Sequence, residues 1–207
     1  TIIFPDPLSM RPQATGPVIR ILAHDGSPLA ERGVSRAYIP LDMLPPHAAD
    51  AVLAIEDRRF FEHPGLDPLG MLRAAVANLR AGRLTQGGST ITQQLAKNLF
   101  LTSERTWSRK AEELVMALWL ELRLEKRDIL ELYLNRVYFG GGAHGIEAAS
   151  QRYFGKSARK LTLAEAAVIA GLLKAPSKYA PSASPVQAVA RGRVVISRMQ
   201  EAGFITA

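Results

Sequence analysis

A short alanine-rich segment, Leu163 to Leu173, is apolar on every side and constrains the fold of this chain more than any other feature. Thr162 and Glu165 form a capping box at its start, and the helical pattern ends before Pro176. A helix that is hydrophobic all round is buried in the core of its domain. We therefore expect a mainly α-helical fold with this segment near its centre.

Helical periodicity with start and stop signals recurs through most of the chain after residue 46. The predicted helices cover residues 47–60, 68–81, 91–101, 108–123, 126–137, 144–154 and 185–202. In the segment 68–81, the spacing predicts a buried stripe made of Leu69, Leu72, Val76 and Leu79. In the segment 108–123, it predicts a core face made of Ala111, Leu114, Val115, Leu118, Trp119 and Leu122.

The first 39 residues differ in character from the rest. Residues 1–17 carry four prolines and no periodicity, which is typical of a linker. After them, Val18–His24 and Pro28–Arg32 flank Asp25-Gly26, which predicts a small β-hairpin. We therefore divide the chain into residues 1–39, linker and hairpin, and residues 40–207, the main domain. The linker-like start and the abrupt end favour a fragment of a larger protein.

Composition narrows the class of partner. The formal net charge is +7 and the pI is near 10.0, which favours nucleic acid, anionic lipid headgroups or a phosphorylated substrate. The chain has no cysteine, so disulfides and thiolate chemistry are excluded. No apolar run approaches the ~20 residues that a membrane-spanning helix needs.

The stretch from Gly87 to Glu113 is the most chemically loaded part of the chain. Thr90 and Gln93 predict a capped helix start, and hydroxyls, amides, cations and a carboxylate follow within a few turns. This mixture suits the binding of a polyanion. The alternative is a solvated helix face with an Arg109–Glu113 surface pair, worth a few tenths of a kcal/mol.

Glu56 follows an apolar run and stands just before its predicted helix ends. An apolar surrounding and the negative end of a helix both raise the pKa of a carboxyl, as a general base near neutral pH requires. The alternative is a surface pair of Glu56 with Arg58 or Arg59. His63 is a weak metal candidate, because no His or Cys stands at ligand spacing from it.

A base and a cationic pocket together suit one type of reaction. A phosphate or pyrophosphate leaving group needs its charge neutralised and does not need a proton, so cations replace the general acid of a hydrolase. Lys97, Arg105 and Lys110 would stabilise such a leaving group while Glu56 activates a hydroxyl.

Four motifs, in this order, resemble those of the peptidoglycan glycosyltransferases, glycosyltransferase family fifty-one: EDRRFFEHPG (56–65), GGSTITQQLAKN (87–98), RKAEE (109–113) and KRDILELYLN (126–135). The segment GIEAASQRYFGK (145–156) is also similar. The resemblance implies a lysozyme-like α fold with a head lobe and a jaw lobe that dips into the membrane surface. It implies polymerisation of lipid II by inverting glycosyl transfer, with release of undecaprenyl pyrophosphate.

The resemblance also implies residue roles. Glu56 matches the family's general base, and Glu113 matches a second catalytic carboxylate at the donor site. The donor-site contacts carry over to Ser89, Gln94, Lys97, Asn98, Arg105 and Lys110. No cofactor is obligatory and no metal ligand is assigned, although a divalent cation such as Mg²⁺ or Mn²⁺ is compatible with the chemistry.

The implied partners are lipid II, the growing lipid-linked glycan and the membrane surface, at the periplasmic face of the inner membrane. A fused transpeptidase domain and other cell-wall synthesis proteins also follow from the family. A mixture that suits an anionic bilayer surface is formed by Leu84, Leu99, Phe100, Leu101 and Trp107 among Arg80, Arg83 and Arg105. The alternative is that these apolar residues belong to the core.

Two rival functions use the same residues. A lysozyme-like enzyme that cleaves glycan would need a general acid and would not need the cations between Lys97 and Lys110. A non-enzymatic basic module would bind a membrane or nucleic acid. Nucleic acid is disfavoured as a partner, because the basic segments lack interleaved aromatic residues other than Trp107.

Overall fold

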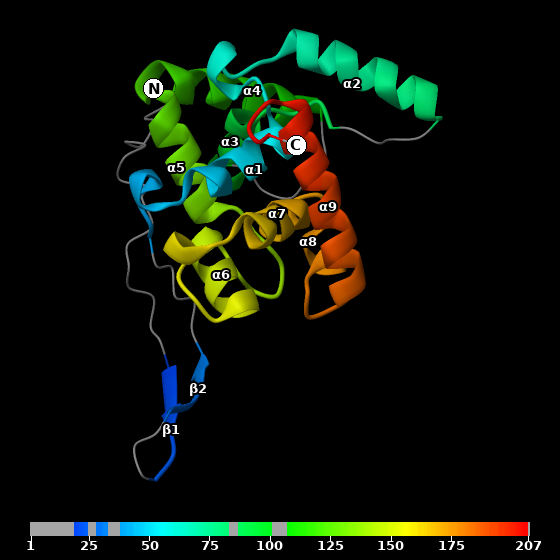
Figure 1. Ribbon diagram of the computed structural model, residues 1–207. Coiled ribbons are helices and arrows are strands. Elements are labelled where there is room, and N and C mark those ends of the chain that lie inside the picture. The colour runs from blue at the N-terminus through cyan, green and yellow to red at the C-terminus, as the bar shows by residue number, and fades with distance from the viewer. Residues whose placement is uncertain (1–18, 25–27, 33–37, 83–86, 101–106, 207) are drawn as a thin grey trace, which may run out of the picture.

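The computed structural model describes residues 19–24, 28–32, 38–82, 87–100 and 107–206. In these ranges the chain is mainly α-helical, as predicted (Figure 1). The helices are α1 (Pro46–Glu56), α2 (Pro68–Ala81), α3 (Ile91–Phe100), α4 (Trp107–Arg123), α5 (Lys126–Arg136), α6 (Ile146–Phe154), α7 (Leu163–Leu172), α8 (Pro176–Tyr179) and α9 (Pro185–Glu201). Short 3-10 turns occur at Leu41–Met43, Phe60–Glu62 and Ala158–Lys160.

Helix α7 lies at the centre, as its apolar sequence predicts (Figure 1). Both bonds of its capping box form: Thr162 N donates to Glu165 Oε2 at 2.8 Å, and Glu165 N donates to Thr162 Oγ1 at 3.4 Å. Its most extensive packing is with α9 and α1. A Cβ added at Gly171 would lie 2.8 Å from Cγ of Arg191, so the missing side chain lets α7 and α9 approach closely.

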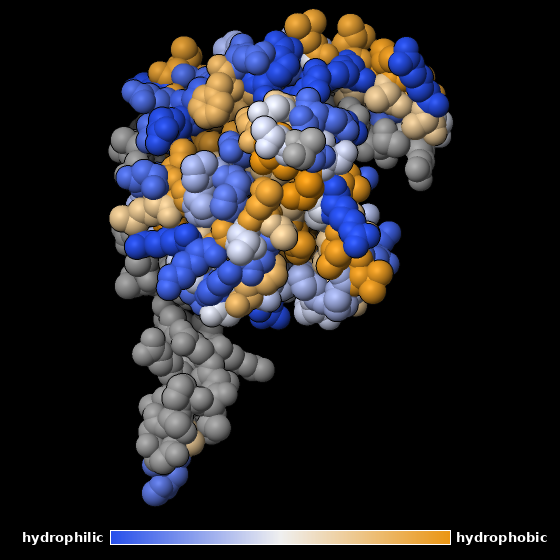
Figure 2. All heavy atoms as spheres, in the orientation of Figure 1, coloured by the Kyte–Doolittle hydropathy of each residue, from blue (hydrophilic) through white to orange (hydrophobic). Residues whose placement is uncertain are grey.

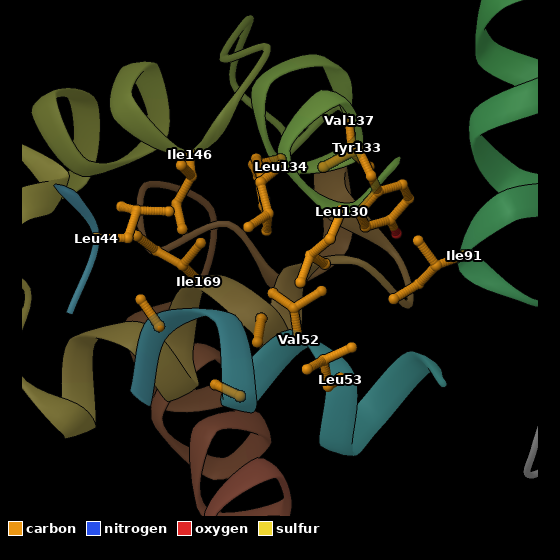
Figure 3. Packing of buried hydrophobic residues seen from close by; sticks show 14 of the residues in the cluster. Leu44, Val52, Leu53, Ile91, Leu130, Tyr133, Leu134, Val137, Ile146 and Ile169 are labelled. Carbon is orange, nitrogen blue, oxygen red and sulfur yellow. The ribbon is translucent and has the colours of Figure 1, made fainter. Parts of the chain in front are cut away.

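The hydrophobic core joins this centre to α3 and α5. Figure 3 shows Val52 and Leu53 from α1, Ile91 from α3 and Leu130 from α5 converging on one cluster. Phe60, in the turn after α1, is also completely buried. This core therefore holds the C-terminal end of α1 against α3 and α5.

The predicted burial of two helical stripes is wrong. On α2, Leu69, Leu72, Val76 and Leu79 are exposed, and Leu79 keeps 82% of its surface accessible. Figure 2 shows apolar side chains on the surface along this helix, at the top of the view. The periodicity identifies an apolar side correctly, but within the described ranges no other element packs extensively against α2.

On α4 the buried side differs from most of the predicted face, although Trp119 of that face packs against the core. Val115, Leu118 and Leu122 are exposed, whereas Ala117 and Leu120 are completely buried. Helix α4 packs chiefly against α3. Because apolar residues occur on several sides of α4, periodicity alone could not select the side that meets α3.

The residues proposed to meet a membrane have mixed outcomes. Leu99 and Phe100 pack against the core, and the Phe100 ring meets Trp119 edge-on with centroids 5.9 Å apart. Leu84, Leu101 and the side chain of Trp107 lie outside the described residues. None of the described helices combines the length and apolarity needed to cross a bilayer.

Strands β1 (Ile19–Leu22) and β2 (Pro28–Arg32) pair antiparallel, with Ile19 opposite Arg32 and Ile21 opposite Ala30. The turn signal Asp25-Gly26 between them lies outside the described residues. The division of the chain at residue 39 remains a prediction.

Candidate active site

Glu56 is the last residue of α1, and its carboxylate is partly buried. Its Oε2 accepts a hydrogen bond from Gln94 Nε2 at 2.8 Å. Burial raises the pKa of Glu56 and nearby Asp57 raises it further, while the Gln94 bond and the positive charge of Arg191 lower it. The net effect is a pKa above the usual value, which is the property that the sequence predicted.

The alternative pairing of Glu56 with Arg59 does not form. Arg59 Nε donates to Glu62 Oε2 at 2.7 Å, and its Nη1 donates to Asp67 Oδ1 at 3.0 Å. The Glu56 carboxylate is therefore bonded by the Gln94 amide from α3. The Arg59 guanidinium pairs with the carboxylates of Glu62 and Asp67 instead.

Gln94 is itself oriented by a buried hydroxyl. Tyr133 Oη, from α5, donates to Gln94 Oε1 at 2.9 Å, so the amide presents its Nε2 to Glu56. Burial raises the pKa of Tyr133 well above its usual value, and the charges of Glu56 and Asp57 raise it further. The hydroxyl therefore keeps its proton and remains a donor.

The role of Tyr133 was not predicted from the sequence. One signal was available. A completely buried tyrosine needs a partner for its hydroxyl, so a tyrosine in a core position predicts a polar neighbour. That partner is Gln94, which was expected to bind substrate and which contacts the Glu56 carboxylate directly.

The segment after α1 folds back over the start of α3. Asp57 Oδ2 accepts from the backbone N of Ile91 at 3.1 Å, and His63 Nε2 bonds Asp57 Oδ1 at 2.9 Å. Thr90 Oγ1 donates to the carbonyl of Gly65 at 2.6 Å. These bonds fix the end of α1 relative to α3, and thereby fix Glu56 relative to Gln94.

Asp57, His63 and Asp67 offer ligand atoms within 4.8 Å of one another, a grouping that could hold a metal ion. His63 was expected to be a weak metal candidate because only His and Cys neighbours were counted, which left out both carboxylates. However, Asp67 is already paired with Arg59, and Arg73 Nη2 lies 3.8 Å from its other oxygen. Two guanidinium groups beside one carboxylate disfavour a cation there, so the arrangement is better described as an ion-pair network.

The first helix of the stretch expected to bind an anion starts as predicted. Thr90 N donates to Gln93 Oε1 at 3.1 Å and Gln93 N donates to Thr90 Oγ1 at 3.2 Å, which completes the predicted capping box. Lys97 and Asn98 are exposed on α3, three and four residues after Gln94. Residues at these spacings share a helix face, so both lie on the side of α3 that carries Gln94.

The start of α4 brings three more of the predicted residues together. Lys110 Nζ forms an ion pair with Glu113 and lies 3.5 Å from Ser89 Oγ. Glu113 is only 5% exposed, so its carboxylate is buried and paired with an ammonium group, unlike the surface pair considered as the alternative. Arg105 lies outside the described residues.

The chain is similar to known proteins over most of its length. The transglycosylase family profile matches residues 25–200. Penicillin-binding protein 1A of Aquifex aeolicus is 53% identical over 171 residues, which are 83% of this chain and 24% of that protein. Penicillin-binding protein 1A of Escherichia coli is 51% identical over 189 residues, which are 91% of this chain and 22% of that protein.

A solved structure agrees with these sequence matches. The crystal structure of penicillin-binding protein 1A from Haemophilus influenzae matches with a TM-score of 0.53 and 28% identity, covering 91% of this chain and 19% of that one. The chain thus spans about a quarter of the length of the curated relatives it matches.

Proposed function

The chain belongs to the transglycosylase family, and from this premise we propose that it is a peptidoglycan glycosyltransferase domain. It polymerises lipid II into glycan strands and releases undecaprenyl pyrophosphate. The observation that carries the proposal is the Glu56 carboxylate: partly buried, raised in pKa, and held by Gln94 at 2.8 Å. Such a carboxylate has the properties of a general base for a sugar hydroxyl.

In the proposed reaction, Glu56 accepts the proton of the acceptor GlcNAc 4-hydroxyl. The oxygen attacks the anomeric carbon of the lipid-linked growing chain, and the bond from that carbon to the pyrophosphate breaks with inversion. The bonding electrons leave with the pyrophosphate, so a general acid is not needed. Gln94 and Tyr133 keep the carboxylate oriented toward the acceptor.

The donor side of the proposed site neutralises the pyrophosphate. Lys97 and Asn98 on α3, Lys110 beside Ser89, and Arg105 supply the positive charge and the donors. Glu113 holds the Lys110 ammonium in place. A divalent cation, Mg²⁺ or Mn²⁺, is not obligatory; when bound, it would add to the same neutralisation of charge.

The proposal extends to the arrangement of the protein. Residues 40–207 form the catalytic domain, with a lysozyme-like head and jaw, and residues 1–39 form a linker with a β-hairpin. The domain acts at the periplasmic face of the inner membrane, and the exposed apolar residues of α2 support contact with the bilayer. A fused transpeptidase domain and cell-wall synthesis proteins are the proposed partners.

The test is polymerisation of lipid II in detergent by the parent chain and by the Glu56→Gln variant. We expect polymer from the parent and a rate lower by roughly 10²–10⁴-fold for the variant, whose amide cannot accept the proton. Circular dichroism would verify that both are folded. Near-normal polymerisation by the variant would refute Glu56 as the base.

The donor side has its own test. Lys97→Ala and Arg105→Ala are expected to weaken binding of the pyrophosphate-bearing lipid more than binding of a soluble glycan of the same sugars. Equal losses for both ligands would argue against a pyrophosphate pocket.

A further inference from the structure

Arg191 is held tightly on α9, beside the two helices that form the centre of the domain. Helix α9 packs against both α7 and α1, as Figure 1 shows. The stem of Arg191 runs over Gly171 of α7, where an added Cβ would lie 2.8 Å from its Cγ. This close contact restricts the path of the side chain from the backbone to the guanidinium.

The guanidinium of Arg191 is incompletely satisfied. Its Nε is buried, and no atom of the described residues accepts a hydrogen bond from it. A buried donor without a partner destabilises the fold, so its presence calls for an explanation. Burial disfavours the charged form of this group and so does the charge of Arg198, whereas the Glu56 carboxylate favours it.

We infer that Arg191 is a positioning residue for the catalytic base: from α9 its positive charge acts on the Glu56 carboxylate that Gln94 and Tyr133 hold from α3 and α5. The inference rests on the proposed function, because it assigns a role to Arg191 only if Glu56 is the base. In the sequence analysis Arg191 had no role.

The electrostatic surroundings of Glu56 explain why such a charge is needed. Burial raises its pKa, and Asp57, next in sequence, raises it further. Gln94 opposes this through its hydrogen bond, and Arg191 opposes it as a cation. Tyr133 is held neutral by its own raised pKa. Among the described groups that shift the pKa of Glu56, Arg191 is therefore the only full positive charge.

The remaining helix at this centre, α7, carries no cation that could act on Glu56 in place of Arg191. The ionisable residue of α7 is Glu165, at its N-terminus, and its carboxylate pairs with Lys156 at 2.7 Å. On the α8 side the titratable neighbour of Arg191 is Tyr179. Removal of the Arg191 charge would thus leave Glu56 with burial and Asp57 raising its pKa, and only the Gln94 bond lowering it.

The test compares Arg191→Gln and Arg191→Lys with Arg193→Gln, which removes an exposed arginine from the same helix. Lipid II polymerisation is measured from pH 5 to pH 9 for each. In Arg191→Gln the acid limb of the kcat/KM profile should move to higher pH. At the acid end, kcat/KM should fall on the order of tenfold for each pH unit by which the limb moves. Arg191→Lys should restore most of the parental profile, and Arg193→Gln should retain it.

A uniform loss of activity at all pH values in Arg191→Gln would overturn the inference, because a purely structural or substrate-binding role does not move the acid limb. A second measurement is independent of turnover: the Glu56 carboxyl is titrated by carbon NMR in the parent and in Arg191→Gln. An unchanged midpoint would also overturn the inference. An inactive parent with a moved midpoint would instead count against the proposed function alone.

Discussion

Replacement of Tyr133 by phenylalanine removes one oxygen from the centre of the proposed site. Tyr133 is completely buried, and its hydroxyl donates to Gln94 Oε1 at 2.9 Å. The variant keeps the ring and its packing but removes the group that fixes the Gln94 amide. We expect a modest loss of stability together with a slower reaction.

The magnitude follows from one hydrogen bond. The net contribution of such a bond to stability is about 1 kcal/mol, and the partly exposed Gln94 can regain a water in its place. For a chain of this length, about 1 kcal/mol lowers Tm by about 2–4 °C. If the same free energy is lost from orientation of the base in the transition state, kcat falls about fivefold.

A matched control is Tyr153→Phe. The Tyr153 hydroxyl donates to the carbonyl of Phe139 at 3.1 Å and is also hydrogen-bonded to the Arg152 side chain, so the control removes the same atom at a residue outside the proposed site. Thermal melting by circular dichroism and initial rates at saturating lipid II are measured for both variants. Both should melt a few degrees lower, and only Tyr133→Phe should lose kcat.

Two results would refute the reasoning. Tyr133→Phe could melt lower and yet keep the parental kcat, in which case the Tyr133–Gln94–Glu56 chain has no part in turnover. Tyr153→Phe could lose as much kcat as Tyr133→Phe, in which case the loss reflects general destabilisation.

Three further predictions concern stability and surface. Glu56→Gln should raise the free energy of unfolding at pH 8, because the raised pKa of Glu56 makes its ionised form unfavourable in the folded state. This gain in stability should vanish near pH 4, where the carboxyl is protonated in both the folded and the unfolded state. Urea unfolding at each pH measures the difference. Thr162→Ala should cost about 0.5–2 kcal/mol in the same assay, with Thr162→Ser largely retaining stability. Leu79→Ser should leave Tm unchanged but weaken vesicle binding, whereas Leu95→Ala, at a completely buried position, should cost about 2–5 kcal/mol.

The helix starts could be predicted because their determinants are local. The capping boxes at Thr90 and Thr162 each join residues three apart, and Pro68 and Gly82 mark the start and the stop of α2. Such bonds depend only on the conformation of one turn. The buried centre at α7 was equally predictable, because a helix without a polar side has no face to offer to water.

The surroundings of the proposed base could be predicted only in part. The apolar run before Glu56 correctly indicated burial and a raised pKa. Its partners come from other helices: Gln94 is 38 residues away in sequence, and Tyr133 is a further 39 residues from Gln94. No pattern within a single helix determines which of many polar side chains will meet across such distances.

Tertiary structure also decided which apolar faces are covered. Periodicity found the stripes of α2 and α4, but burial requires a second element at the right place, and α2 has none within the described residues. The sequence by itself thus determined most of the helices and the capping boxes at Thr90 and Thr162. Only the packing of α1, α3, α5 and α9 brought Glu56, Gln94, Tyr133 and Arg191 together, because contacts between helices depend on how the whole chain folds back on itself.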